Sequence, residues 1–154
     1  FLNIKYADDA NNHTQQYIEL CKEFSTEVLK PNYGAKEQNT FLAETIDFFK
    51  ENEIVNIERF KEELFEDEKH IREFENYKKE YEGEKNLVLR NQFDVAEAVV
   101  TKEKRKIKTD IKLDTNIQIK LDIDAPDASS EYLERGYDDE KKMHYYKVFF
   151  NAEN

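Results

Sequence analysis

The stretch "TKEKRKIKTDIKLDTNIQIKLDI", from Thr101 to Ile123, is where the hydrophobic period of the chain changes. From Ile107 onward apolar residues stand at every second position, and the alternation resumes after the polar residues Asp114–Asn116. Two alternating runs around a short turn of this kind predict a β-hairpin. The first part of the stretch carries a dense group of basic residues, although the formal net charge of the chain is −11. The stretch therefore predicts both a sheet and a local cationic surface.

Upstream of this stretch the apolar residues follow the helical period. Their three- and four-residue spacing predicts helices over about residues 9–29 and 35–52, then two shorter ones. We expect Pro31 and Gly34 to end the first helix. Asn56 and Asp67 have suitable side chains to cap the third and fourth helices, and Gly83 should end the fourth. The inward stripe of the second helix is Phe41, Leu42, Thr45, Ile46, Phe48 and Phe49.

The remaining chain predicts short elements. Asp94 and Glu97 have the spacing of a capping box, which predicts a short helix from Val95 to about Lys102. After the hairpin we expect a loop and a short helix that is capped by Asp127 and ended by Gly136. A polar turn then leads into a last strand, Met143–Phe150, which is apolar enough to require a partner.

The predicted fold class is α+β, with about four helices in the N-terminal part followed by a small three-stranded antiparallel sheet with short helices. In that sheet the last strand pairs with the hairpin. We expect one domain over residues 1–154, with an acidic helical part at 1–83 and the hairpin, short helix and last strand at 84–154. The chain starts without Met, so a fragment of a longer protein is expected.

Charge is distributed unevenly along the chain. Residues 1–98 carry 13 Lys and Arg against 23 Asp and Glu, whereas residues 99–154 carry 11 against 12. Such a chain does not coat DNA with its whole surface, because each phosphate contact needs a local cation. The single cysteine, Cys21, excludes an internal disulfide and is typical of a reducing cytoplasm. No apolar run approaches the roughly 20 residues that span a bilayer, so no membrane partner is expected.

Catalytic signals are weak. His13, His70 and His144 are scattered, and Cys21 lies on an apolar stripe, so it is a core residue rather than a nucleophile paired with His13. The sequence contains no glycine-rich phosphate loop. We therefore predict no enzyme and no cofactor.

Three acidic residues, Asp122, Asp124 and Asp127, invite comparison with a calcium loop. An EF-hand loop that begins at Asp122 would need Gly in its sixth position and Glu in its twelfth, where this chain has Asp127 and Leu133. A solvated loop with a helix cap is the better interpretation, and no metal site is predicted.

The remaining candidates for a binding role are basic. They follow one another through the end of a predicted helix and into the hairpin: Lys102, Lys104, Arg105, Lys106, Lys108, Lys112 and Lys120. A row of ammonium groups on one ribbon face can follow phosphates without reading a base sequence. Lysines on a hairpin also solvate a sheet and protect its edge from pairing. The sequence leaves both interpretations open.

Several segments carry a family resemblance. "FLNIKYADDANNHTQQYIELCKEF", "ENEIVNIERFKEELFEDEKHIREFENYKKEYE" and "LDTNIQIKLDI…YLERGYDDEKKMHYYKVFF" together resemble, in order, the 37-kDa nucleoid-associated bacterial proteins, particularly their Bacteroidetes-type members. The second hairpin strand departs from the His-containing strand associated with that family. The resemblance implies a cytoplasmic protein of the bacterial nucleoid, associated with DNA and without known enzymatic activity. It transfers a role to no individual residue.

Two functional hypotheses follow. In the first, the chain is a non-enzymatic, DNA-linked nucleoid domain whose basic hairpin contacts phosphates. In the second, it is a protein-interaction or dimerisation module that binds nucleoid proteins or another copy of itself, and the missing N-terminal part contacts DNA. An enzyme ranks third, because a nuclease would need clustered carboxylates with a metal ion.

Overall fold

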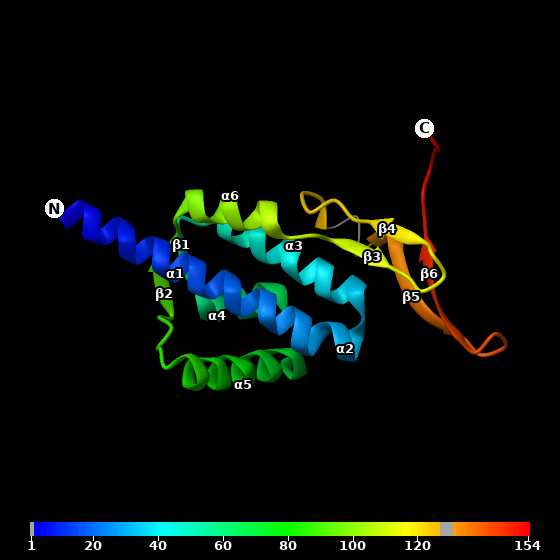
Figure 1. The fold of residues 1–154 in the computed structure, drawn as a ribbon, viewed down its shortest axis with the longest axis horizontal. Coiled ribbons are helices and arrows are strands. Elements are labelled where there is room, and N and C mark those ends of the chain that lie inside the picture. Colours follow the sequence, from blue (N-terminus) through cyan, green and yellow to red (C-terminus); the bar gives the residue numbers. More distant parts are fainter. Residues whose placement is uncertain (1, 127–130) are drawn as a thin grey trace.

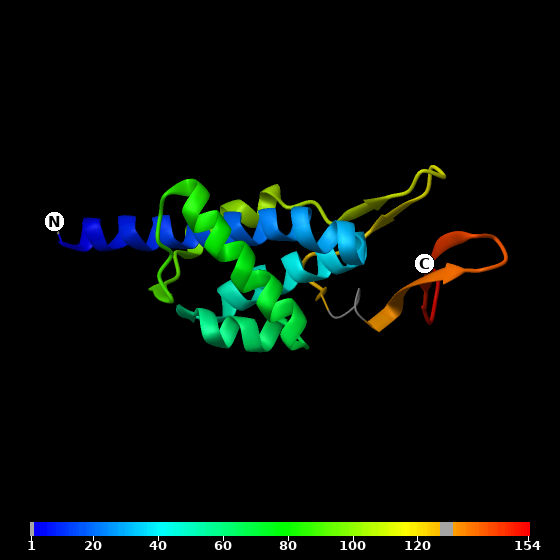
Figure 2. The same ribbon diagram turned by 90° about the horizontal axis from the view of Figure 1, so that it is seen from below.

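Helices form an elongated body, and small β-ribbons lie at its two ends (Figure 1, Figure 2). The computed structural model describes residues 2–126 and 131–154. The helices are α1 (Leu2–Phe24), α2 (Lys30–Tyr33), α3 (Ala35–Glu51), α4 (Ile57–Leu64), α5 (Glu68–Lys85) and α6 (Glu97–Lys106), with a π-helical turn at Ser25–Leu29. The strands are β1 (Ile54–Asn56), β2 (Gln92–Asp94), β3 (Asp110–Lys112), β4 (Gln118–Lys120), β5 (Leu133–Asp138) and β6 (Met143–Val148). The predicted α+β class is confirmed.

The first helical segment passes through Pro31 and ends only at Gly34. Pro31 directly follows the π-helical turn, in which the Lys30 N–H donates to the carbonyl of Ser25, and the backbone stays helical through it. Gly34 takes a φ of +96°, which side chains disfavour, and α3 begins directly after it. Within residues 2–126 and 131–154, no helix is long and apolar enough to cross a membrane.

Two of the four predicted side-chain caps, Asn56 and Asp67, are confirmed. The side-chain amide oxygen of Asn56 accepts hydrogen bonds from the backbone N–H groups of Glu58 and Arg59, at 3.0 and 3.3 Å. The Asp67 carboxylate accepts the backbone N–H of His70 at 2.8 Å. Each cap satisfies N–H groups that the first helical turn leaves without a partner, so the starts of α4 and α5 are determined locally.

Two other predicted helix boundaries are wrong. Gly83 lies inside α5, which ends instead at Asn86 in the left-handed conformation. Asp94 belongs to β2, and α6 begins after Ala96 with no side-chain cap. The Ala96 N–H donates to the hydroxyl of Thr14 on α1, so a tertiary contact replaces the expected cap. As a result α6 extends to Lys106 and carries most of the basic run.

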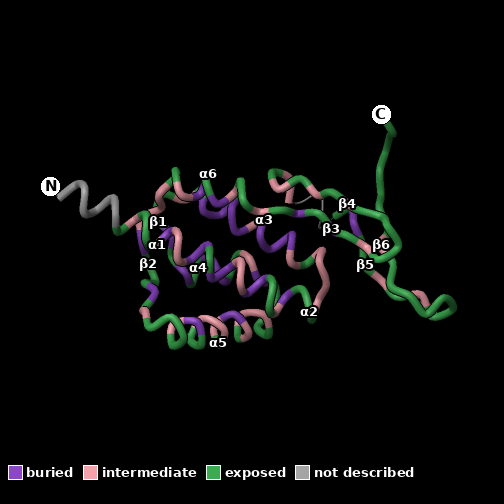
Figure 3. Tube along the Cα trace, viewed as in Figure 1, coloured by how far each residue is buried: buried purple, intermediate pink, exposed green. Residues whose placement is uncertain are grey.

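The core is aromatic, and Phe24 lies at its centre. Its ring makes edge contacts with Phe41, Phe65, Phe74 and Tyr77, at centroid distances of 5.6, 6.1, 5.2 and 5.6 Å. Such edge-to-face pairs add stabilisation beyond the area that they bury. The whole predicted stripe of α3 is buried, and Figure 3 shows the buried positions on the facing sides of the helices.

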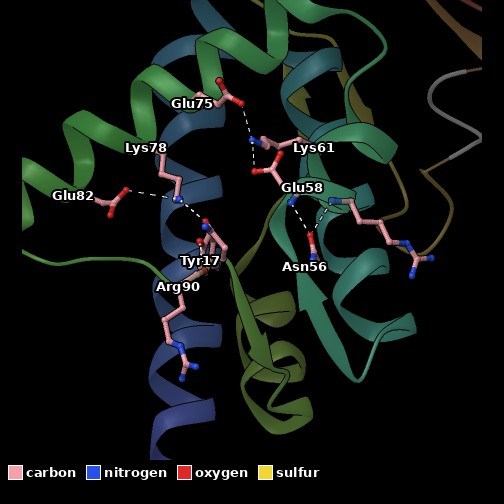
Figure 4. Close-up of polar contacts among 10 residues, drawn as sticks. Tyr17, Asn56, Glu58, Lys61, Glu75, Lys78, Glu82 and Arg90 are labelled. Carbon is pink, nitrogen blue, oxygen red and sulfur yellow. Dashed lines mark hydrogen bonds and ion pairs between the residues drawn. The ribbon is translucent and has the colours of Figure 1, made fainter.

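A two-stranded ribbon, β1–β2, joins the body at the end opposite the other ribbons. Val55 pairs with Phe93 across it, and both side chains are buried. Phe93 stacks on Tyr17 of α1 at 4.9 Å, and the Tyr17 hydroxyl donates to the backbone carbonyl of Arg90 at 2.5 Å (Figure 4). The sequence did not predict this ribbon, because three-residue strands are too short to show an alternation.

A buried lysine joins α4 to α5. The ammonium group of Lys61 binds Glu75 at 2.7 Å and Glu58 at 3.0 Å (Figure 4). Burial alone would lower the pKa of Lys61, but the hydrogen bonds to both carboxylates outweigh burial and the pKa lies above its ordinary value. The lysine therefore remains charged and fixes the two helices against each other.

The predicted three-stranded sheet is wrong in its pairing. β6 pairs with β5, and β3 pairs with β4, in separate two-stranded sheets. The helix that should have ended at Gly136 gives way to β5 from Leu133, and its predicted cap, Asp127, lies outside the described residues. The Asp138 carboxylate accepts the N–H groups of Glu140 and Lys141, both at 2.9 Å. This tight local turn brings β6 back onto β5, so β6 does not reach the more distant hairpin.

Replacing Gly34 with alanine should destabilise the fold by about 1–3 kcal/mol, because φ of +96° is costly for any residue with a Cβ. The new Cβ would also lie 2.7 Å from Nε of Arg135. Gly83→Ala is the matched control. Its Cβ meets nothing within 4 Å in the interior of α5, so it should stabilise the chain by about 0.5–1 kcal/mol. Urea unfolding measures both changes, and a Gly34→Ala variant as stable as the wild type would contradict this account.

Candidate functional site

The basic helix α6 is held on α1 by a buried carboxylate. Glu103, whose side chain is 1% exposed, accepts hydrogen bonds from Gln15 at 2.9 Å and Lys106 at 3.2 Å. Lys22 of α1 forms an ion pair with the same carboxylate at 3.4 Å. Val100, one turn earlier, is buried on the same side of α6. These contacts turn the opposite side of α6 toward solvent.

The groups around Glu103 stabilise its negative charge. Burial by itself would raise the pKa of this carboxyl group. The hydrogen bonds from Lys106 and Gln15 and the positive charge of Lys22 outweigh burial, and the pKa lies below its ordinary value of 4.5. Within the sequence this residue is only an interruption of the basic run, and no local pattern marks it as buried.

Two of the seven predicted basic residues are occupied by acidic partners. Lys106 binds Glu103, as described above, and Lys104 forms an ion pair with Asp124 in the loop after β4. The hydrogen bond with Asp124 raises the pKa of Lys104. Asp124 also lies 4.0 Å from the ammonium group of Lys50. Lys104 thus connects α6 to this loop, whereas the pair of Lys106 and Glu103 lies within α6.

The other five predicted residues have exposed side chains and form no ion pair with any residue of segments 9–126 and 131–154. We refer to them together as the basic surface: Lys102, Arg105, Lys108, Lys112 and Lys120. Lys102 and Arg105 are three residues apart on α6 and therefore share its outer face. Lys108 lies in the connection between α6 and β3.

The β3–β4 hairpin contributes two lysines to the basic surface, and both lie on the same face of the hairpin. In the register of β3 and β4, Lys112 lies opposite Gln118 and Lys120 lies opposite Asp110. Residues that face each other across a ladder point to the same side, so Lys112 and Lys120 share a face, as predicted. Asp110 is the acidic residue of this face and partly offsets its charge. Figure 1 and Figure 2 show that α6 continues into this hairpin beyond one end of the helical body.

The base of the hairpin is fixed to α3. The buried Asn39 side chain donates to the backbone carbonyl of Thr109 at 3.0 Å. The Thr109 hydroxyl donates to the carbonyl of Leu121 on the returning strand. Ile111, opposite Ile119, is buried on the apolar face. The sequence predicted the apolar face but gave no indication of Asn39, whose partner is 70 residues away.

The groups considered for catalysis lie apart from this surface. Burial raises the pKa of the Cys21 thiol, although a hydrogen bond with Thr45 opposes the shift, so the thiol remains protonated. His13 lies beside Phe93, at a centroid distance of 6.0 Å. The described residues contain no group of three His, Cys, Asp or Glu side chains arranged to hold a metal ion. Asp124 binds Lys104, as described above.

One family model matches the chain. The family is described as nucleoid-associated protein YejK, and the match extends over residues 1–142. It includes α6, the β3–β4 hairpin and all seven predicted basic residues. Neither a curated protein nor a solved structure gives a significant match.

Glu103→Gln should destabilise the chain by about 1.5–3 kcal/mol at pH 7, because it replaces hydrogen bonds to a charged, buried group. The folded pKa of Glu103 lies below 4.5, so its stabilising effect is present above pH 4.5 and disappears as the pH falls through the folded value. The difference between variant and wild type should therefore shrink on acidification. Urea unfolding at several pH values measures it, and a difference that grows in acid would refute the stabilising role of the charge.

Proposed function

Because the chain belongs to the family described as nucleoid-associated protein YejK, we propose that this nucleoid protein domain contacts DNA through its basic surface. The contact is with phosphates and is independent of base sequence. The observation that supports the proposal is the set of five exposed cations, on α6, the following connection and the β3–β4 hairpin, that have no acidic partner among the described residues. Cations without partners can bind phosphates without first losing an ion pair.

The charge of the rest of the chain restricts how DNA can approach. Residues 1–98 carry ten more acidic than basic residues, so the helical body repels a phosphate backbone. DNA would then meet α6 and the hairpin and avoid most of the body. Each cation that neutralises a phosphate releases condensed counterions, so the affinity should fall steeply with added salt.

Lys104 and Lys106 have a supporting part in this proposal. Both hold acidic partners, Asp124 and Glu103, and a phosphate would have to compete with these carboxylates. Their main effect is to orient α6. We therefore assign the phosphate contacts to the basic surface and not to all seven basic residues.

A second candidate function is protein interaction, which the acidic body favours. With 23 acidic and 13 basic residues, residues 1–98 offer charge complementarity to a basic protein surface. DNA contact would then belong to another part of the nucleoid assembly. The two candidates differ in one measurable respect, because only the first requires DNA affinity that depends on the basic surface.

The decisive variant is Lys102→Glu with Arg105→Glu, which reverses the charge on the outer face of α6 and leaves the Glu103 contacts intact. If two phosphate contacts are lost, the slope of log affinity against log salt should fall by about 2. Duplex DNA binding over a salt series measures the slope. The separate pair Lys112→Glu with Lys120→Glu tests the hairpin in the same way.

The matched control is Arg72→Glu with Lys79→Glu, which reverses the charge of two exposed residues of α5 that form no ion pair in segments 9–126 and 131–154. It changes the net charge by the same amount as each test pair. The control should leave the salt slope close to that of the wild type. Equal slopes for the wild type, both test pairs and the control would rule out the basic surface as the DNA contact.

A further inference from the structure

The C-terminal hairpin exposes one face that carries large apolar side chains. In its register Gly136 lies opposite Tyr145 and Asp138 lies opposite Met143. The Phe149 N–H donates to the carbonyl of Tyr132 at 2.8 Å, which continues the pairing beyond the strands. Side chains at these positions point to the same side of the ribbon. We call this side the aromatic face, and it consists of Tyr132, Met143, Tyr145 and Phe149.

The aromatic face is about half exposed in the described molecule. Its four side chains are 52%, 50%, 42% and 46% exposed, in the order given above. The other face touches the body only in part: Leu133 is buried there and the Arg135 side chain lies against Gly34, but Tyr137 and Val148 of the same face are 51% and 54% exposed. Figure 1 and Figure 3 show the ribbon standing beyond the helices with mostly exposed positions. The largest contiguous apolar patch on a soluble protein often marks a site of interaction.

We propose that the aromatic face binds the aromatic face of a second copy of this chain, across a two-fold axis. Four large side chains that are each about half exposed present on the order of 400 Å² of apolar surface. Two such faces would bury on the order of 800 Å² in total, which is the size of a weak, reversible protein interface.

The charges on this face are self-complementary. Glu134 and Lys147 lie opposite each other in the register, between the Tyr132–Phe149 pair and Tyr145. They form no ion pair with each other or with any other described residue. A two-fold axis repeats every contact, so an ion pair from Lys147 of one copy to Glu134 of the other would occur twice in the interface.

Long-range charge also favours this end of the molecule. The helical body is strongly acidic, and two bodies repel each other when they approach. Residues 131–150 carry five acidic and four basic residues, so the hairpin itself is nearly neutral. Contact between two hairpins keeps the acidic bodies apart. Single-stranded nucleic acid, which could stack on the same aromatic side chains, is disfavoured because Glu134 and Asp138 lie on this face and repel phosphates.

The test is the mass of the 154-residue chain in the absence of nucleic acid, measured by sedimentation equilibrium over a range of concentrations. We expect the wild type to reach twice the chain mass of 18.5 kDa. Phe149→Glu places a charge in the proposed apolar contact and should weaken association by at least about tenfold. Val88→Glu, at a site that is 83% exposed in the connection between α5 and β2, is the control and should dimerise normally.

A charge exchange tests the register without altering the apolar contacts. Lys147→Glu and Glu134→Lys should each weaken the dimer, and the double variant should restore it. A wild type that stays monomeric at every soluble concentration overturns the proposal, and so does a Phe149→Glu variant that dimerises as well as the wild type. A monomer whose affinity for oligothymidine falls on Phe149→Glu would assign the face to nucleic acid instead.

The dimer is independent of the phosphate contact proposed above. Lys102→Glu with Arg105→Glu lies on α6, away from the C-terminal hairpin, and should leave the sedimentation mass unchanged. Phe149→Glu should in turn leave the salt slope of DNA binding per chain unchanged. Failure of either proposal can therefore be recognised separately.

Discussion

The buried carboxylate of Glu103 is the contact on which the arrangement of the C-terminal half depends. It accepts hydrogen bonds from Gln15 and Lys106 and pairs with Lys22, so it joins α6 to α1 at one point. A carboxylate that is 1% exposed is costly unless its partners are in place, which makes the position of α6 specific. The chain leaves α6 directly into the β3–β4 hairpin, so the same contact also determines where that hairpin starts.

The basic residues of α6 fall into two groups with different physical roles. Lys104 and Lys106 neutralise acidic groups, and Lys104 also holds α6 to the loop after β4. Lys102 and Arg105 lie on the outer side of the same helix and face water. Counting charges along the sequence treats these residues as equivalent. Their availability to a phosphate differs because Lys104 and Lys106 already hold carboxylates, whereas Lys102 and Arg105 form no ion pair in the described part of the chain.

The features that could be predicted from the sequence are those set by neighbouring residues. The stripe of α3 is buried as its spacing predicts, Asn56 and Asp67 cap their helices, and Lys112 and Lys120 share a hairpin face. Predictions failed where distant contacts decided the outcome. Asp94 was expected to cap α6, but it pairs in β2, and the partner of the Ala96 N–H is Thr14, 82 residues away.

The pairing of the last strand, β6, is a second feature that the sequence could not predict. Its apolar composition predicted a partner, but the sequence did not identify which one. A turn centred on the Asp138 carboxylate makes β5 the nearest partner, since closing a short loop costs less conformational entropy than reaching β3–β4. The separate hairpin that results leaves the aromatic face about half exposed.

By itself the sequence determined the α+β class, the helical stripes, the local caps and the presence of a cationic stretch in an acidic chain, because each depends on residues within one or two turns of each other. Only the tertiary structure decided which cations are free, which carboxylate is buried and which face of the C-terminal hairpin meets water. Those properties depend on packing between segments that are far apart in the chain, and no local pattern encodes their geometry.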